Sequence, residues 1–144
     1  MKRKKGKKSR APKKITFREC GECTVCCTAL TVPSLEKPKQ KECDHLCGDG
    51  GGCGIYKSRP TECREFQCLW TQGVLTESHR PDKIGIMAYY VDTQFGETLL
   101  MTETIPNAYN ENSLAKDEII KVAEGRKLAA ILATYNGEAI VMVP

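Results

Sequence analysis

Eight cysteines fall into two blocks whose spacing suits metal binding. The first block has the pattern Cys20-x2-Cys23-x2-Cys26-Cys27. The second block consists of Cys43, Cys53, Cys63 and Cys68. Thiolates held two or three residues apart are soft ligands, which suit zinc, iron or an iron–sulfur cluster. These eight side chains are therefore the candidate metal ligands of the chain.

The geometry of the first block argues against a complete site on one helix. On an ideal helix its four side chains point within an arc of about 120°, so they share one face. Cys20 and Cys27 are nevertheless about 10 Å apart along the axis, whereas sulfurs on one tetrahedral zinc lie only about 3.8 Å apart. Either the helix unwinds or the sulfurs divide between metals. With the second block, eight thiolates fill two tetrahedral sites or one polynuclear cluster.

Such a site needs positive charge close by. Two zinc ions with eight thiolates carry a formal charge of about −4, which is costly to bury. Four basic residues near the blocks are candidates to offset it, namely Arg18, Lys57, Arg59 and Arg64. The alternative for these side chains is ordinary solvation at the surface.

The ninth cysteine and the two histidines are weaker candidates. Cys47 lies four residues after Cys43 and is a ligand, a replacement for Cys43, or a thiol that binds no metal; we favour the last. His45 lies between them and is interpreted as a solvated loop residue. We assign no role to His79. With only two histidines, general-base chemistry has few candidates, and we find no catalytic constellation.

The distribution of cysteines indicates the compartment. All nine lie between Cys20 and Cys68, whereas a disulfide scaffold usually spreads its bridges over the fold and needs an oxidising compartment. The basic N-terminus is not followed by the apolar segment of a signal peptide, and no apolar run reaches about 18 residues. We therefore expect a cytoplasmic protein without a membrane segment, in which the thiols stay reduced.

Charge is concentrated at the N-terminus. Residues 1–14 contain nine Lys or Arg and no acidic residue, so the remaining 130 residues carry a net charge of −5. We expect residues 1–14 to form a disordered basic tail, because dense like charges repel. The tail either makes weak contacts with nucleic acid or another polyanion or is a solubilising extension. We favour the extension, because no aromatic residue interleaves with the charges to stack on bases.

The periodicity of the chain predicts a single α+β domain over residues 15–144 after the tail. A cysteine-rich half of helices and loops covers 15–72, with short helices over 15–30 and from Pro60 toward Phe66. A β-β-α-β half covers 82–144. Its predicted elements are strands over 83–91 and 98–105, a helix over 114–135 and a strand over 139–143.

The cysteine motif resembles that of a known family. The pattern Cys20-x2-Cys23-x2-Cys26-Cys27, then Cys43-x2-Leu46, then Cys53-x-Ile55-Tyr56-x2-Arg59-Pro60-x2-Cys63-Arg64-x-Phe66-x-Cys68, resembles the YkgJ-like cysteine-cluster family, the CxxCxxCC zinc- or iron-chelating domain. The resemblance covers about residues 18–90. It implies a metal-binding domain, found mostly in bacteria, whose ligands are the eight cysteines above; Cys47 has no counterpart in the motif.

Three functions follow as alternatives. The first is a protein that chelates zinc or iron through about eight thiolates and needs the metal for its fold. The second is an iron–sulfur oxidoreductase or electron carrier, a label given to some members of that family. The third is a nucleic-acid-associated zinc protein that uses the basic tail. A related cysteine block occurs in flagellin lysine methylases, but the chain lacks a glycine-rich nucleotide-binding loop after a strand, so that activity is not expected.

Overall fold

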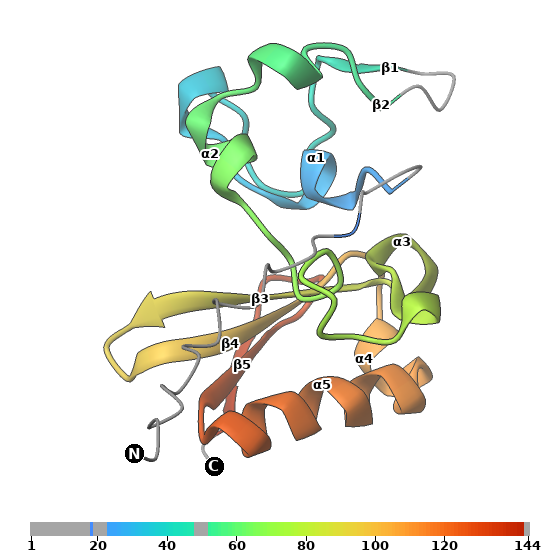
Figure 1. Cartoon of the computed structure of the whole chain (residues 1–144), viewed down its shortest axis with the longest axis vertical. Helices are drawn as coiled ribbons and strands as arrows, with labels where there is room; N and C mark the ends of the chain where they lie inside the picture. Colours follow the sequence, from blue (N-terminus) through green and yellow to red (C-terminus); the bar gives the residue numbers. More distant parts are fainter. Residues whose placement is uncertain (1–17, 19–22, 48–51, 143–144) are drawn as a thin grey trace, which may run out of the picture.

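The computed structural model describes residue 18 and residues 23–47 and 52–142. The basic tail over 1–14 and the candidate ligand Cys20 therefore lie outside the described residues. Figure 1 shows two parts: the cysteine half, here the described residues from 23 to 66, and the sheet half, residues 74–142. Residues 67–73 join them.

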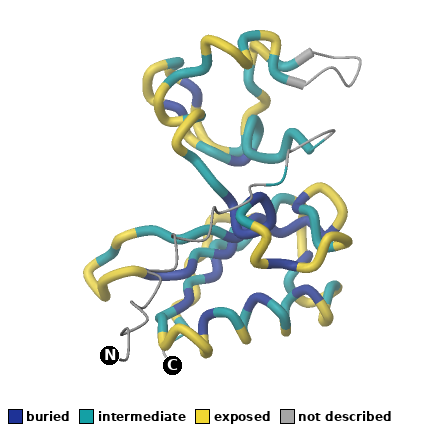
Figure 2. The backbone as a smooth tube through the Cα atoms, in the orientation of Figure 1, coloured by how far each residue is buried: buried dark blue, intermediate teal, exposed yellow. Residues whose placement is uncertain are grey.

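The cysteine half is made of short elements separated by loops. They are α1 (Val25–Ala29), η1 (Pro33–Leu35), β1 (Leu46–Cys47), β2 (Gly52–Cys53), η2 (Tyr56–Ser58) and α2 (Thr61–Glu65). Few of its side chains are buried, as Figure 2 shows. Among the placed side chains from 23 to 66, only Ala29, Val32 and Lys37 are buried. The described part of this half therefore has almost no hydrophobic core.

The sheet half contains a four-stranded sheet and the longest helix of the described chain. Its strands are β3 (Ile86–Thr93), β4 (Gly96–Glu103), β5 (Ala129–Ala133) and β6 (Ala139–Met142), in the order β3-β4-β5-β6. Its helices are η3 (Glu77–His79), α3 (Pro81–Ile84), α4 (Ala108–Glu111) and α5 (Ser113–Arg126). The predicted α+β class is confirmed. None of the described helices is long and apolar enough to cross a membrane.

The first two strands of the sheet form a hairpin. β3 and β4 are antiparallel and in register from Ile86↔Glu103 to Thr93↔Gly96. Gly96 has φ +82° at the end of the turn, where glycine avoids the penalty that a Cβ would incur. The first strand begins three residues later than predicted, because Pro81–Ile84 forms a helical turn that ends at Gly85 with φ +72°.

The predicted helix over 114–135 is wrong beyond residue 126. α5 ends at Arg126, Lys127 adopts the left-handed conformation with φ +55°, and Ala129–Ala133 forms β5. β5 lies parallel to β4 and antiparallel to β6. From β3 onward the order of the sheet half is thus β-β-α-α-β-β. The turn at Gly137 joins β5 to β6.

The hydrophobic core lies mainly in the sheet half and the joining segment, and Ala29 of α1 also belongs to it. Its most deeply buried side chains are Leu69, Ile86, Met87, Leu99, Met101 and Ile119. Ile119 comes from α5 and Leu69 from the joining segment, so both pack against the sheet in one cluster. Each large apolar side chain that is fully buried stabilises the folded state by about 1.5–3 kcal/mol. The sheet half therefore contains most of the hydrophobic core, and the cysteine half packs against it.

Three contacts attach the joining segment and the cysteine half to the sheet. Leu69 N donates a hydrogen bond to Ala88 O at 2.8 Å. The Phe66 ring meets the Tyr89 ring edge-on, with centroids 5.0 Å apart. Gln40 Nε2 donates to Glu103 O at 3.1 Å. These contacts position the loops that carry the second cysteine block relative to the sheet.

Candidate metal centre

The first cysteine block lies only partly on a helix. α1 carries Cys26 and Cys27, whereas Cys23 precedes it in non-helical backbone. Over the described residues, the helix predicted for 15–30 is reduced to Val25–Ala29. The straight helix that would separate the sulfurs along one axis is therefore not formed at Cys23.

Backbone hydrogen bonds bring the second block up to the first. Cys43 N donates to Cys27 O at 3.0 Å, which fixes the start of the second block beside α1. The β1–β2 pairing then places Leu46 opposite Cys53. Cys63 lies on α2, where its N–H donates to Pro60 O at 3.0 Å. Four separate segments of the chain thus supply cysteines to one region.

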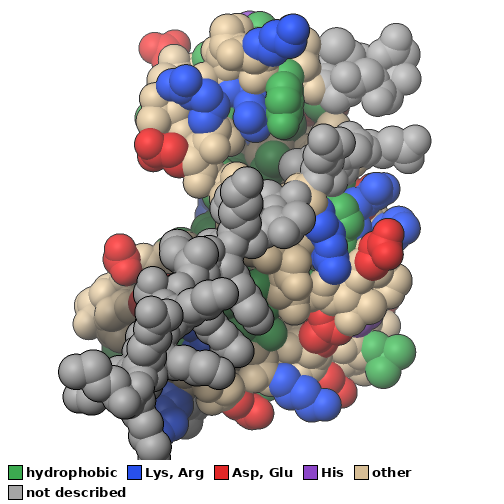
Figure 3. Space-filling model, viewed as in Figure 1, with side chains coloured by type: hydrophobic (Ala, Val, Ile, Leu, Met, Phe, Trp, Pro, Cys, Tyr) green, Lys and Arg blue, Asp and Glu red, His purple; other side chains and the backbone are tan. Residues whose placement is uncertain are grey.

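A cavity of about 390 Å³ lies between these segments. Six of the eight candidate ligands line it: Cys23, Cys26, Cys27, Cys43, Cys53 and Cys63. All the residues that line it belong to the cysteine half, and several Lys and Arg side chains lie on the face of this half seen in Figure 3. The fold therefore gathers cysteines that are up to forty residues apart in the sequence.

The described cysteines line the cavity but are not close enough together to form a complete metal site. Among the described residues, no three His, Cys, Asp or Glu side chains are grouped closely enough to hold a metal ion. None of the placed cysteine side chains is joined to another described cysteine by a disulfide. The described cysteines thus line the same cavity without forming a ligand group or a disulfide with one another.

The remaining two cysteine candidates have different surroundings. Cys68, 8 % exposed, lines an adjoining cavity together with Cys23, Cys26 and Cys63, and its Sγ lies 3.6 Å from Thr71 Oγ1. Cys20 lies outside the described residues. The backbone of Cys47 forms part of β1, within the hairpin that presents Cys53.

The thiols influence one another's protonation. A hydrogen bond with Cys26 lowers the pKa of Cys27 to about 7; burial opposes this shift, while the positive charges of Lys37 and Arg59 contribute to it. The pKa of Cys63 is raised by burial and by the nearby negative charges of Cys27, Cys43, Cys53 and Glu62. The cluster therefore favours a thiolate at Cys27 and needs positive charge to ionise further.

Lys37, which was not among the predicted counter-charges, supplies one such charge. Its residue surface is only 6 % exposed. Its Nζ donates hydrogen bonds to three backbone carbonyls, Thr28 O at 3.0 Å, Leu30 O at 2.5 Å and Pro38 O at 3.0 Å. Burial lowers the pKa of Lys37, and the cysteines Cys43, Cys27, Cys26 and Cys63 oppose that shift. Nothing in a lysine-rich loop distinguishes this lysine until the loop is folded.

Two of the four predicted counter-charges line the cavities. Arg59 borders both cavities, and its guanidinium lies 3.9 Å from the centre of the Tyr56 ring. Arg18 borders the second cavity and lies 5.2 Å from the centre of the Trp70 ring. Lys57 and Arg64 are exposed and line neither cavity.

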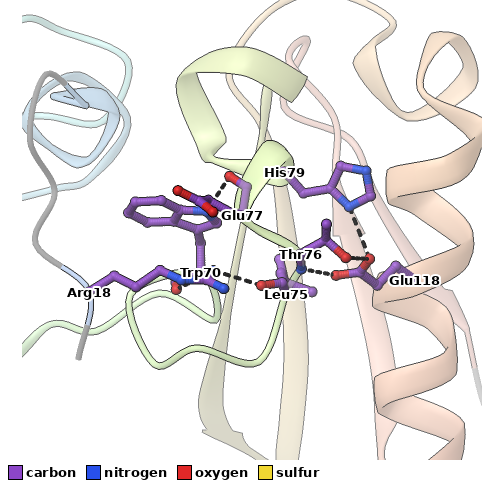
Figure 4. Close-up of polar contacts among 7 residues, drawn as sticks. All are labelled: Arg18, Trp70, Leu75, Thr76, Glu77, His79 and Glu118. Carbon is purple, nitrogen blue, oxygen red and sulfur yellow. Dashed lines mark hydrogen bonds and ion pairs between the residues drawn. The ribbon is translucent and has the colours of Figure 1, made fainter. Parts of the chain in front are cut away.

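The histidines lie apart from the cysteine cavity. His45 is exposed and lines neither cavity. His79 has a structural contact that the sequence analysis missed: its Nδ1 lies 3.1 Å from Glu118 Oε2 (Figure 4). That nitrogen is buried, and Glu118 is its only polar contact among the described residues.

Comparison with known proteins yields no relative from which a function could be transferred. No family model matches the chain, and no characterised protein or solved structure shows significant similarity to it.

Proposed function

We propose that the chain binds zinc or iron through cysteine thiolates and needs the metal to fold its cysteine half. The ligands proposed are the eight cysteines of the two blocks. The supporting observation is that six of them, from four separate segments, line one cavity of about 390 Å³. Convergence of this kind is typical of a thiolate metal site.

The poor core of the cysteine half supports the same proposal. Only three of the placed side chains from 23 to 66 are buried, and one of them is Lys37, whereas ordering the backbone alone costs about 1–2 kcal/mol per residue. Structural zinc contributes apparent binding free energies of about 10–16 kcal/mol in small domains. Bound metal would therefore supply the free energy that stabilises the folded cysteine half.

The donor set suits a soft or borderline metal. All the candidates are sulfurs, and Lys37 and Arg59 lie close enough to stabilise their negative charge. When bound, zinc would link the four segments, and an iron–sulfur cluster would add electron transfer. The proposal includes a reducing, cytoplasmic setting, since the thiols must stay reduced. The iron–sulfur oxidoreductase remains the alternative, which the metal content of the protein distinguishes.

Serine substitutions test which residues hold the metal. We expect Cys63→Ser to lose metal and thermal stability together, because metal affinity here is folding free energy. Cys47→Ser is the matched control: it removes a thiol of the same cysteine-rich region and should keep the wild-type metal content. Metal per chain is measured by mass spectrometry of metals, and stability by thermal unfolding.

The outcome is read from both variants together. A Cys63→Ser protein that keeps all its metal and its melting temperature would show that Cys63 is not a ligand. A Cys47→Ser protein that loses metal as Cys63→Ser does would place the ninth cysteine in the site and overturn the proposed ligand set.

A further inference from the structure

A second cavity, of about 220 Å³, adjoins the cysteine cavity near the joining segment. Its wall includes Trp70 and Thr71 from the joining segment, Pro81 from α3 and Met87 from β3. Six residues line both cavities: Cys23, Cys26, Tyr56, Arg59, Cys63 and Phe66. A molecule in the second cavity would therefore lie directly beside the cysteines.

The charge of this pocket is opposite to that of the rest of the domain. Its described lining contains two arginines, Arg18 and Arg59, and no aspartate or glutamate. Residues 15–144 carry a net charge of −5, so a pocket with two cations and no described carboxylate is a local exception. The lining also contains four of the candidate ligands, Cys23, Cys26, Cys63 and Cys68. Bound metal would neutralise part of their charge, and the two arginines would then attract an anion.

Among the described residues, the hydrogen bonds of both arginines use only part of each guanidinium. Arg59 donates from Nε to Tyr56 O at 2.9 Å, and no described residue accepts a hydrogen bond from its two terminal nitrogens. Arg18 donates from Nη1 to Trp70 O at 3.2 Å and Leu75 O at 2.6 Å, which holds it in place, as Figure 4 shows. The paired terminal nitrogens of a guanidinium match the two oxygens of a carboxylate.

The rest of the wall is apolar and aromatic. Trp70, Phe66 and Met87 contribute large apolar side chains. Trp70 is held by a hydrogen bond from its Nε1 to Glu77 O at 2.9 Å, and Phe66 by its edge contact with Tyr89. Rigid aromatic walls favour a flat apolar ligand body, and the small volume limits its size, since pockets for drug-sized ligands occupy about 300–1,000 Å³.

We propose that this pocket binds a small organic carboxylate with a flat apolar body. Arg59 holds the carboxylate, with Arg18 providing further positive charge, and Trp70 and Phe66 contact the body. The carboxylate binds beside the metal, a role that rests on the proposed function. The cysteine cavity and this pocket then act as neighbouring metal and ligand sites.

The single tryptophan of the chain makes the pocket directly observable. Trp70 is the only tryptophan, so its fluorescence reports on this wall alone. The full-length, metal-loaded protein is titrated with benzoate as the probe, and with benzamide as a neutral molecule of the same shape. We expect saturable quenching by benzoate with a Kd of about 1 mM or tighter, and at least tenfold weaker binding of benzamide.

Substitutions locate the binding. Arg59→Gln should weaken benzoate binding by about tenfold or more, because it removes the charge and the paired donors. Arg64→Gln is the matched control: Arg64 lies on α2, is exposed and lines neither cavity. It should leave the Kd unchanged. Arg18→Gln, with an expected loss of at least threefold, gives an independent reading should Arg59→Gln disturb the fold.

Metal content is measured on every sample, so the two proposals fail separately. A metal-loaded wild-type protein that does not bind benzoate, or that binds benzamide equally well, would overturn the carboxylate pocket and leave the metal site standing. Wild-type affinity in both arginine variants would also overturn it. Benzoate binding in a chain that takes up no metal would support the pocket and overturn the metal site.

Discussion

At the scale of single residues, the positive charges distinguish the cysteine cavity from a mere cluster of thiols. Lys37 is held by three backbone carbonyls, with Nζ close to the carbonyls of Thr28, Leu30 and Pro38. All three ammonium protons are therefore used, and the group acts as a fixed charge rather than a base. The positive charge of Lys37 helps to lower the pKa of the nearby Cys27 thiol.

We predict that Lys37→Met destabilises the protein by about 3 kcal/mol. The substitution leaves three carbonyls without their donor, and each unsatisfied buried group costs about 1–3 kcal/mol, part of which water recovers. It also removes positive charge near the thiolates, so metal affinity should fall. Unfolding in urea and competition with a chelator measure the two effects.

Lys39→Met is the control for that experiment. Lys39 belongs to the same loop but is exposed, so its removal should change stability by less than about 0.5 kcal/mol. Equal effects of the two substitutions would show that Lys37 has no special role.

The residue scale also separates what the sequence can predict from what it cannot. The spacing of the cysteines predicted which thiols line the cavity. Only cysteine supplies a thiol, so these candidates can be found without knowing the backbone conformation. Lys37 could not be found in this way, since its burial depends on the Val32–Lys37 bridge that closes its loop. Charged side chains acquire such roles only from tertiary contacts.

At the scale of elements, Glu118 ties the loop around η3 to α5. It accepts hydrogen bonds from Thr76 N and from Thr76 Oγ1, the latter at 2.5 Å, and lies beside His79 (Figure 4). Burial raises the pKa of Glu118, but the hydrogen bonds from Thr76 and the interaction with His79 outweigh it, so the pKa is lowered from its ordinary 4.5. The folded state thus prefers the ionised carboxylate.

The sign of that shift fixes the pH dependence. The stabilisation by Glu118 is fully present above about pH 4.5 and is lost as the pH falls through the lower folded pKa. We predict that Glu118→Gln costs about 1 kcal/mol at pH 7, and that the difference from wild type shrinks below about pH 4. Urea unfolding at several pH values checks this. A difference that is constant with pH, or equal to that of Glu124→Gln at an exposed position of α5, would contradict it.

Gly85 ends α3 and allows β3 to begin. Its φ is +72°, and a Cβ at this position would meet Ile105 Cγ1 at 2.5 Å. Ile105 is half exposed and can move, but the positive φ remains unfavourable. We predict that Gly85→Ala destabilises the protein by about 1–2 kcal/mol, as measured by urea unfolding.

Gly125→Ala is the matched test on α5. A Cβ there meets nothing within 4 Å, and alanine favours a helix by up to about 1 kcal/mol over glycine. Gly125→Ala should therefore be neutral or stabilising. Equal destabilisation by both substitutions would contradict the backbone explanation for Gly85.

The strand β5 could not be predicted from the sequence. Its residues, Ala129–Ala133, have the composition of a helix and follow α5 almost directly. They form a strand because the segment pairs with β4 on one side and β6 on the other, and these contacts override local propensity. The helix ends at Arg126 because the next residue, Lys127, adopts the left-handed conformation, although a lysine gives no stop signal in the sequence.

At the scale of the whole molecule, the two halves differ in what stabilises them. The sheet half has a continuous core around Leu99, Met101 and Ile119. The described cysteine half has three buried side chains and a cavity lined by six thiols. Metal bound in that cavity would serve as the core that the cysteine half lacks, and the sheet half would remain folded without it.

The most direct test is the metal content of the full-length protein purified without oxygen. We predict a stoichiometric metal: about two zinc ions in a colourless protein, or iron with inorganic sulfide in a brown one. Its removal by a chelator should unfold the cysteine half while the sheet half keeps its strands. A folded protein that carries no zinc or iron, with its cysteines reduced or joined in disulfides, would contradict the proposed function.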